Sequence, residues 1–252
     1  MIARPVRALS SLVAVLLAAA CTNSFEIPIE TPIRPKLDVA AFQRVLVAGF
    51  IAGGTEDVDG NLETTRLLRS QLRTKSQLRV IDSDVLPLVD VASEGREADG
   101  AAAPQAPAPI KEEKDLEAYE HLFANVEYWK KIGEEYQQPL IVTGTVMFTP
   151  LQRNSIVQRE QEVYDSFGRR RVVPVRTYME RKGFSLDGRF IFIDGRSGAT
   201  LHSESFGEQI LYNANQTTPA LSSYFELMDR LIPTFLSTLS SQKIKGTRIL
   251  LQ

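Results

Sequence analysis

Two apolar runs of strand length constrain the fold of this chain most strongly. They are residues 45–50 (VLVAGF) and residues 140–148 (LIVTGTVMF). A strand whose side chains are apolar in both directions is buried on both faces, as in a sheet that helices cover. Gly53 and Gly54 end the first run and leave it the length of one strand. The runs therefore predict two buried strands of an α/β domain.

Helical spacing of apolar residues follows the first strand and recurs twice. Asn61 can cap the first helix, and Glu63 favours its first turn. The apolar face of that helix contains Leu62, Thr65, Leu68 and Leu72. A short strand over 78–81 and a brief helix over 85–91 follow. Residues 115–136 and 221–239 show the same spacing and predict two further helices.

The second half of the chain predicts a pair of antiparallel strands. Residues 184–193 alternate, with Phe184, Leu186, Phe190 and Phe192 on one face. The sequence DGRSG at 194–198 is typical of a tight turn, which leads to a strand over 199–212. Residues 248–251 fit a last edge strand. We therefore predict one mixed β-sheet with helices packed on it: a βαβ start, then a β-hairpin and a C-terminal helix.

The only cysteine of the chain, Cys21, directly follows a short apolar run. Arg4 and Arg7 precede this run, which covers 8–20 and is too short to span a bilayer. The segment resembles a bacterial lipoprotein signal, in which the cysteine thiol is acylated and becomes the new N-terminus. The alternative is an ordinary secretory signal that leaves a free thiol.

This signal predicts the organisation of the rest of the chain. Residues 1–20 would be the signal peptide, and 21–42 the acylated cysteine with an extended tether. The remainder, 43–252, would be the α/β domain. Thr22 stands where an Asp would favour the inner membrane, so the resemblance implies a lipid-anchored protein at the outer membrane that faces the periplasm. Without a second cysteine, neither a disulfide nor a thiolate metal site can form.

Charge sets further limits on the function. The formal net charge is −2, and loss of Arg4 and Arg7 with the signal peptide makes it −4. This balance gives no reason to expect nucleic-acid binding. Residues 92–114 are rich in Ala and Pro and predict a flexible acidic insertion within the domain. A solvated loop is the simplest interpretation of that insertion.

Several stretches resemble one family of envelope proteins. They are RVLVAGF at 44–50, ETTRLLRSQL at 63–72, RVIDSD at 79–84, LIVTGTV at 140–146 and FSLDGRFIFIDGRSGATLHSE at 184–204. With the signal at Cys21, their order resembles the curli assembly and secretion lipoproteins. That group includes the penicillin-binding-protein activator lipoproteins and the N-terminal domain of the Tol-system propeller protein. The resemblance implies an envelope protein that acts through an unidentified protein partner, with homo-oligomers among its expected forms.

The polar segment 150–183 is the candidate contact surface. It holds eight basic residues and four acidic ones, and 163–169 (VYDSFGR) predicts a hairpin tip with Phe167 and Gly168 at the turn. Aromatic and arginine side chains favour protein interfaces. The predicted partner-binding residues are Tyr164, Phe167, Arg169, Arg170 and Arg171. The alternative is a solvated hairpin whose charges protect its edges.

In the curli secretion lipoproteins this region crosses the outer membrane, which this sequence does not favour. A lipid-facing strand needs apolar side chains at every second position. Over 154–165, Glu160 and Glu162 fall on one face and Arg159 on the other. The gap between Tyr212 and Leu221, where a second crossing hairpin would fall, is too short to cross twice. We therefore expect a periplasmic relative that forms no pore, with a secretion-pore subunit as the alternative.

The sequence contains no catalytic motif. The glycine loop at 49–54 lacks the spacing of a phosphate loop, and nearby acids would repel a phosphate. His121 and His202 lie on different elements and have no metal-ligand spacing around them. We therefore predict a protein that is not an enzyme and uses no metal or cofactor. An envelope hydrolase is a weaker alternative, because it would need a cleft of converging acids.

Overall fold

The computed structural model describes residues 24–97, 109–213, 216 and 218–251. Two units are distinguished: Met1–Arg34 with Ser241–Gln252, and Pro35–Ser240, which we call the body. Cys21, the predicted signal peptide over 1–20 and the centre of the predicted insertion over 98–108 lie outside the described residues. Among the described residues, no helix is both long and apolar enough to span a membrane.

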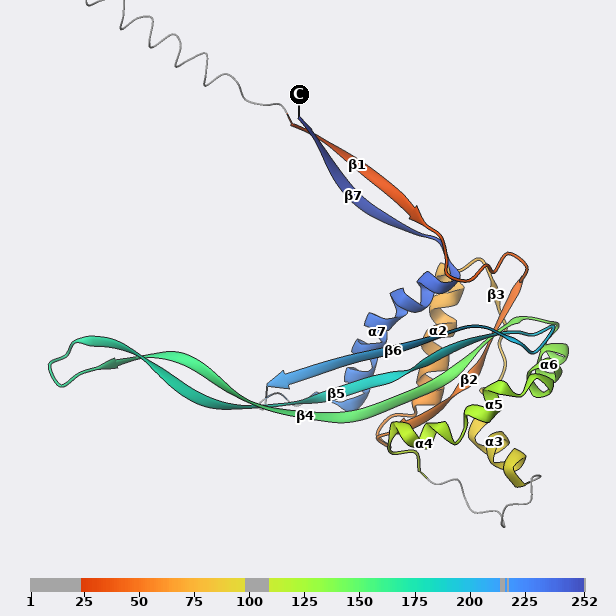
Figure 1. Cartoon of the computed structure of the whole chain (residues 1–252), viewed down its shortest axis with the longest axis horizontal. Helices are drawn as coiled ribbons and strands as arrows, with labels where there is room; N and C mark the ends of the chain where they lie inside the picture. Colours follow the sequence, from red (N-terminus) through yellow and green to blue (C-terminus); the bar gives the residue numbers. More distant parts are fainter. Residues whose placement is uncertain (1–23, 98–108, 214–215, 217, 252) are drawn as a thin grey trace, which may run out of the picture. The chain divides into compact units, whose positions relative to one another are not determined.

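The body is built on one mixed sheet of five strands (Figure 1). The strands are β2 (Arg44–Gly54), β3 (Arg79–Val80), β4 (Leu140–Tyr164), β5 (Arg170–Asp194) and β6 (Thr200–Asn213). Their order across the sheet is β3-β2-β4-β5-β6. β2 runs parallel to both β3 and β4, whereas β4, β5 and β6 are antiparallel neighbours. The predicted fold class is therefore confirmed.

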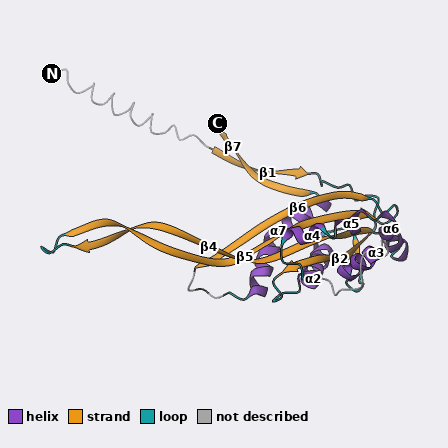
Figure 2. Ribbon diagram, turned by 60° about the horizontal axis from the view of Figure 1, so that its bottom comes forward, coloured by secondary structure: helices purple, strands orange, loops and turns teal. Residues whose placement is uncertain are grey.

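Helices cover both faces of this sheet (Figure 2). They are α2 (Gly60–Lys75), α3 (Leu88–Glu97), α4 (Glu113–Glu117), α5 (Glu120–Ala124), α6 (Val126–Glu135) and α7 (Ala220–Leu239). α2 and α7 pack on one face, where they form one core cluster with the strands. α3 to α6 pack on the other face around a second cluster. The sheet is thus buried on both sides where its strands are apolar on both sides.

Alternation along β5 assigns its residues to these two clusters as the sequence predicts. Phe190 and Phe192 point toward α7, where their rings lie 5.0 and 5.8 Å from that of Phe235. Ile191 and Ile193 belong to the cluster on the opposite face. The side-chain period of two thus places one strand in both halves of the core.

The N-terminus of α2 differs in detail from the prediction. Asp59, and not Asn61, caps this helix: its Oδ1 accepts the N–H of Leu62 at 3.0 Å. Asn61 Oδ1 accepts the N–H of Phe50 at 2.7 Å. The amide of Asn61 therefore ties the first turn of the helix to the end of β2.

The single helix predicted over 115–136 is wrong, because the structure has three short helices there. Asn125 begins α6 by accepting the N–H of Tyr128 at 3.0 Å. The indole of Trp129, fully buried, donates to Leu122 O at 2.9 Å and so satisfies a carbonyl at the end of α5. The breaks let Phe123 and Trp129 reach the same core cluster from successive helices.

The tether predicted over 21–42 is wrong for the residues that form β1 (Ser24–Ile33). This strand is extended but pairs antiparallel with β7 (Gln242–Leu251) over ten positions. We call this pair the ribbon. Residues 35–42 belong to the body, where Leu37 N donates to Thr238 O at 2.9 Å and Phe42 is buried. The predicted edge strand at 248–251 is the end of β7.

Candidate functional site

β4 and β5 continue past the rest of the sheet as a two-stranded hairpin over 150–183, which we call the arm (Figure 2). Their pairing is uninterrupted from Leu140↔Asp194 to Tyr164↔Arg170. β2 stops pairing with β4 at Phe148, and β6 stops pairing with β5 at Arg181. Beyond these points the arm has no third strand.

The tip of the arm lies where the sequence predicts it. Asp165 N donates to Arg169 O at 3.0 Å, and Gly168 N donates to Asp165 O at 2.9 Å. Gly168 has a φ of +72°, in the left-handed region that glycine adopts without strain. A turn over 165–169 therefore reverses the chain.

Asp165 holds this turn with its side chain. Oδ1 accepts the N–H groups of Phe167 and Arg169 at 2.9 Å each, and Oδ2 accepts from Arg169 Nε at 3.0 Å. The backbone hydrogen bond from Arg169 is the main cause that lowers the pKa of the Asp165 carboxyl, with help from the other two bonds. The turn is therefore organised around an ionised carboxylate.

The five predicted partner-binding residues gather at this tip with different surroundings. Tyr164 and Phe167 are 70 % and 81 % exposed. Arg169 pairs with Asp165 and lies over the Phe167 ring at 5.4 Å, and Arg170 pairs with Glu162. Arg171 is exposed and makes no ion pair with any described residue. Two of the three arginines thus stabilise the tip, and one is available to a partner.

The structure adds to the candidate surface two exposed residues that were not among the predicted contact residues. Ile156 and Tyr178 pair across the arm and are 72 % and 63 % exposed. The strand register places them on the same face as Tyr164. Four more basic side chains of the arm make no ion pair within the described residues: Arg153, Arg159, Arg176 and Arg181. Only the pairing of β4 with β5 brings these residues together, and the sequence does not fix that register directly.

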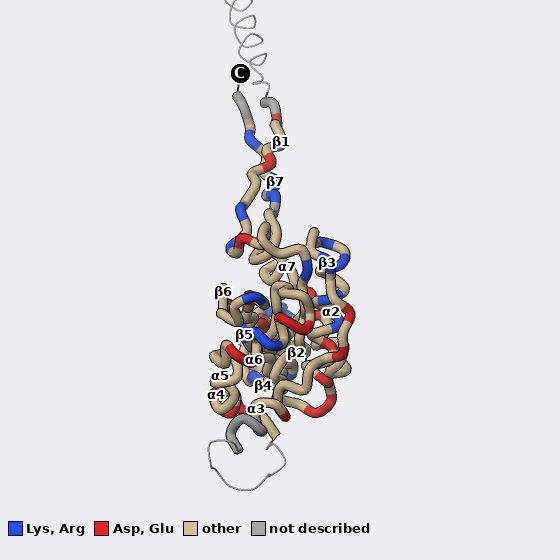
Figure 3. Tube along the Cα trace, turned by 90° about the vertical axis from the view of Figure 1, so that its right-hand side faces the viewer, with Lys and Arg blue, Asp and Glu red and all other residues tan. Residues whose placement is uncertain are grey.

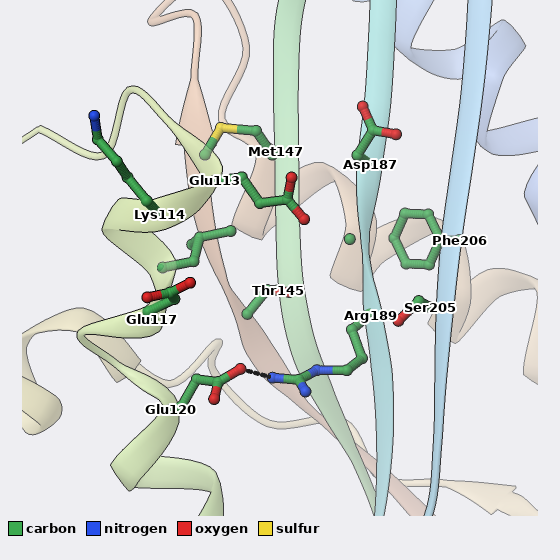
Figure 4. A pocket seen from close by; sticks show the side chains of 12 residues that line it. Glu113, Lys114, Glu117, Glu120, Thr145, Met147, Asp187, Arg189, Ser205 and Phe206 are labelled. Atoms are coloured by element: carbon green, nitrogen blue, oxygen red, sulfur yellow. Dashed lines mark hydrogen bonds and ion pairs between the residues drawn. The ribbon is translucent and has the colours of Figure 1, made fainter.

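A pocket of about 490 Å³ lies on the sheet face that α4 covers (Figure 4). Its walls are α4, the start of α5, and strands β4, β5 and β6. The ionisable residues that line it are Glu113, Lys114, Glu117, Glu120, Asp187 and Arg189. Sequence reasoning missed this pocket because its lining residues come from five separate elements.

The chemistry of the pocket is that of a solvated, mixed-charge surface. Arg189 Nη2 donates to Glu120 at 2.7 Å, so this pair neutralises itself. Glu113 and Glu117 are exposed, and Asp187 accepts a hydrogen bond from Ser185 Oγ. A catalytic carboxylic acid requires burial or a close like charge to raise its pKa. Among the described residues that line the pocket, no acidic side chain is buried.

The two histidines lie on different elements, His121 in α5 and His202 in β6. The Nδ1 and Nε2 atoms of His121 lie 2.9 Å from Ala118 O and 3.2 Å from Ala92 O. His202 lies 3.7 Å from Glu204. Within the described ranges, no group of three or more His, Cys, Asp or Glu is placed to hold a metal ion.

The glycine loop after β2 has a packing role. Gly54 N donates to Ile110 O at 2.9 Å, and a Cβ at Gly54 would lie 1.9 Å from Phe148 O. A Cβ at Gly53 would meet Ile110 at 2.5 Å. These glycines leave room for the neighbouring chain, Ile110 beside Gly53 and Phe148 beside Gly54.

Comparisons with families of known sequences and with curated proteins give no match for this chain. Solved structures similar to it include the lipoprotein GNA1162 from Neisseria meningitidis (13% identity, 77% of this chain and 97% of that one, TM-score 0.35). The PelC dodecamer from Paraburkholderia phytofirmans is 15% identical over 86% of this chain and 100% of that one, with a TM-score of 0.36. The LpoB C-terminal domain from Salmonella enterica is 10% identical over 79% and 94%, with a TM-score of 0.33. The solved structures to which this chain is similar thus include a bacterial lipoprotein.

Proposed function

We propose that this chain is a bacterial envelope lipoprotein that has no catalytic role and acts by contact with another protein. Acyl chains on Cys21 would hold it at the outer membrane, facing the periplasm. The arm would be the contact surface. The observation that carries this proposal is a two-stranded extension of the sheet that exposes aromatic and unpaired basic side chains on the same structure.

The arm contributes little to the packing of the body. None of its residues from 150 to 182 is buried, whereas the buried apolar residues of the body lie on either side of it in the sequence. A two-stranded hairpin without a third strand or a packed face has marginal stability in water. A binding partner would supply the contacts that the arm lacks. The long arm would then serve to reach and hold that partner.

The charge of the arm indicates the kind of partner. Eight basic residues stand against four acidic ones, and Arg171 and Arg176 make no ion pair with described residues. An acidic protein surface complements this charge and would speed the encounter between the two proteins. Tyr164, Phe167 and Tyr178 would then supply the apolar anchors that dominate binding energy.

The same charges favour a protein over lipid as the environment of the arm. Register places Glu160 and Arg176 on one face and Arg159 and Arg181 on the other. A lysine or arginine on a lipid-facing strand costs about 2–4 kcal/mol at the bilayer midplane. A protein partner can pair these charges, which hydrocarbon cannot do.

Site-specific photocrosslinking in cells tests the contact surface. A photoreactive residue at position 167 should yield an adduct with a partner, because Phe167 is 81 % exposed at the tip. Arg171→Glu with Arg176→Glu should abolish that adduct, since the variant reverses charge without touching the Asp165 turn. A photoreactive residue in place of the exposed Arg66 on α2 is the matched control and should not yield it.

Two results would contradict the proposed contact. One is the same adduct from positions 66 and 167. The other is an adduct at position 167 that persists when both arginines are reversed. A ring-shaped oligomer with channel conductance in detergent would favour the secretion-pore alternative.

The anchor is tested separately from the arm. Metabolic labelling with a fatty acid should mark the wild-type protein, and Cys21→Ser should abolish the label and release the protein from membranes. Continued membrane association of an unlabelled Cys21→Ser protein would show that the acyl anchor is not what holds it.

A further inference from the structure

The ribbon of β1 and β7 has two chemically different faces. Paired residues of antiparallel strands share a face, and successive residues alternate. Ile27, Ile29 and Ile33 therefore lie together, and they are 43 %, 38 % and 46 % exposed. Thr31 lies among them. We call this side the isoleucine face.

The opposite face is charged. Glu30 lies 3.1 Å from the Lys243 ammonium group and 3.9 Å from that of Lys245, and Glu26 is also on this side. Figure 3 shows the acidic residues along β1 and the basic residues along β7. The strands thus turn their ion pairs to one side, which also carries the exposed Ile249 opposite Glu26, and leave three isoleucines on the other.

The edge of β1 is unsuited to another strand. Proline has no N–H to give to a ladder, so Pro28 and Pro32 fit β1 only where the backbone nitrogen faces away from β7. Both prolines then stand on the outer edge and remove two donors from it. Such prolines disfavour the addition of a strand at this edge.

We propose that the isoleucine face lies on the surface of the lipid bilayer to which the chain is anchored. This inference rests on the acyl anchor proposed above. Cys21 precedes Ser24 by three residues, which span at most about 11 Å. The ribbon would therefore begin at the membrane surface, where an apolar face with charges opposite it lies in the interface.

The charges of the ribbon fit this orientation. Arg248, paired with Ile27, is the one charged residue that the register places on the isoleucine face. An arginine at an interface can lay its methylene stem along apolar groups while its guanidinium reaches lipid phosphates. Glu26 and Glu30 would face the periplasm, away from anionic lipids. The ribbon would then be a second membrane contact beside the acyl chains.

The test uses a matched pair of labels on opposite faces. Residues 21–252 with Cys21→Ser contain no thiol, so one cysteine can be introduced and labelled with the polarity-sensitive dye NBD. Thr31→Cys puts it on the isoleucine face and Thr247→Cys on the charged face, and both threonines are exposed. A histidine tag before residue 21 holds either protein on vesicles of phosphatidylethanolamine and phosphatidylglycerol that contain a nickel-chelating lipid.

We expect vesicles to raise the NBD emission severalfold and shift it to the blue at position 31, with little change at position 247. Adding Ile29→Ser and Ile33→Ser should remove the change at position 31. Unchanged emission at position 31, or an equal rise at both positions, would overturn the proposal. A rise at position 31 that grows with protein concentration and needs no vesicles would show that a second copy covers the face instead.

These outcomes do not depend on the acyl anchor, because the tag replaces it. A chain that lacks fatty acid at Cys21 in cells but shows the contrast between positions 31 and 247 would contradict the anchor alone. A chain that is acylated but shows no contrast would contradict the membrane face alone.

Discussion

Single glycines of the body mark places where two backbones touch. A Cβ on Gly133 of α6 would lie 1.7 Å from Gly195 O, in the turn between β5 and β6. At the other end of this contact, a Cβ on Gly198 would lie 2.1 Å from Val126 O, and Gly198 has a φ of +73°. A glycine on each side of the helix–turn contact therefore leaves room for the backbone of the other side.

Gly133→Ala is expected to destabilise the body. The added methyl group would clash with backbone atoms of Gly195. Because backbone cannot rotate away as a flexible side chain can, the helix must move away from the turn. Such overpacking costs about 2–3 kcal/mol, which would lower the unfolding midpoint by about 6–9 °C. Thermal unfolding followed by circular dichroism measures this, with Gly246→Ala as the control because nothing lies within 4 Å of that position. Equal unfolding midpoints for Gly133→Ala and Gly246→Ala would contradict the close contact between α6 and the turn.

The lowered pKa of Asp165 predicts how the tip of the arm responds to pH. Because folding depresses this pKa, the ionised carboxylate stabilises the turn above its unfolded pKa of about 4, and the effect is lost as pH falls through the folded value. We expect the amide resonances of Phe167 and Arg169 to shift together in an acid titration by NMR. Asp165→Asn should abolish that transition, since the amide does not titrate. A titration that follows the ordinary pKa of aspartate would show that the turn does not hold the carboxylate.

Among the elements, the arm continues two strands far beyond the core that they help to form. β4 is buried from Leu140 to Phe148, while its residues from 152 onward are mostly exposed. β5 mirrors this change, with Gly183 to Ile193 holding its buried positions. The same two strands thus serve the core at one end and reach solvent at the other.

Removal of the arm is therefore expected to leave the body folded. Replacing residues 154–180 by Asn-Gly would join Arg153 to Arg181, which already pair, through a two-residue turn. The unfolding midpoint should change by no more than about 3 °C, the shift that about 1 kcal/mol produces in a domain of this size. This variant lacks position 167, so it should not form the crosslink that is expected at the tip. A large loss of stability would mean that the arm supports the fold.

Elements with a strong local signal could be predicted from the sequence. The alternation at Phe190 to Ile193 assigns both halves of the core, because a strand has a period of two residues. The breaks between α4, α5 and α6 could not be predicted as readily. Helical spacing of apolar residues continues across Asn125, and only the buried Trp129, with its bond to Leu122 O, shows why the chain turns there.

Features that depend on residues far apart in the sequence could not be predicted from it. Pro28 and Pro32 indicate an unpaired tether, yet both fit the outer edge of β1, and its partner β7 begins more than 200 residues later. The pocket could not be predicted for the same reason. Two of its residues, Glu120 and Arg189, meet only after α5 packs on the sheet. The candidate contact surface was predicted in part: the tip turn is local, but the pairing of Ile156 with Tyr178 requires the register.

The whole molecule combines a stable body with smaller parts that have no core of their own. Every buried hydrophobic residue in the described part of the chain lies between Phe42 and Leu239, inside the body. The ribbon has ten paired positions but no buried side chain among those described. If the proposed function holds, the body is a scaffold, and the arm and the ribbon are the surfaces that meet a protein and a membrane.

This division predicts how the chain unfolds. A chain that ends at Ser240 lacks β7, so β1 loses its partner, while all buried hydrophobic residues of the body remain. We expect its unfolding midpoint to stay within about 3 °C of that of the full chain. In the full chain, hydrogen exchange should be fast at Ile27 and Ile29 and slow at Val142 and Phe192, because a two-stranded ribbon opens locally at little cost. A large fall in the midpoint after truncation, or equal protection at all four sites, would show that the ribbon and the body unfold as one cooperative unit. In that case the isoleucine face would not be free to meet a membrane without disturbing the fold.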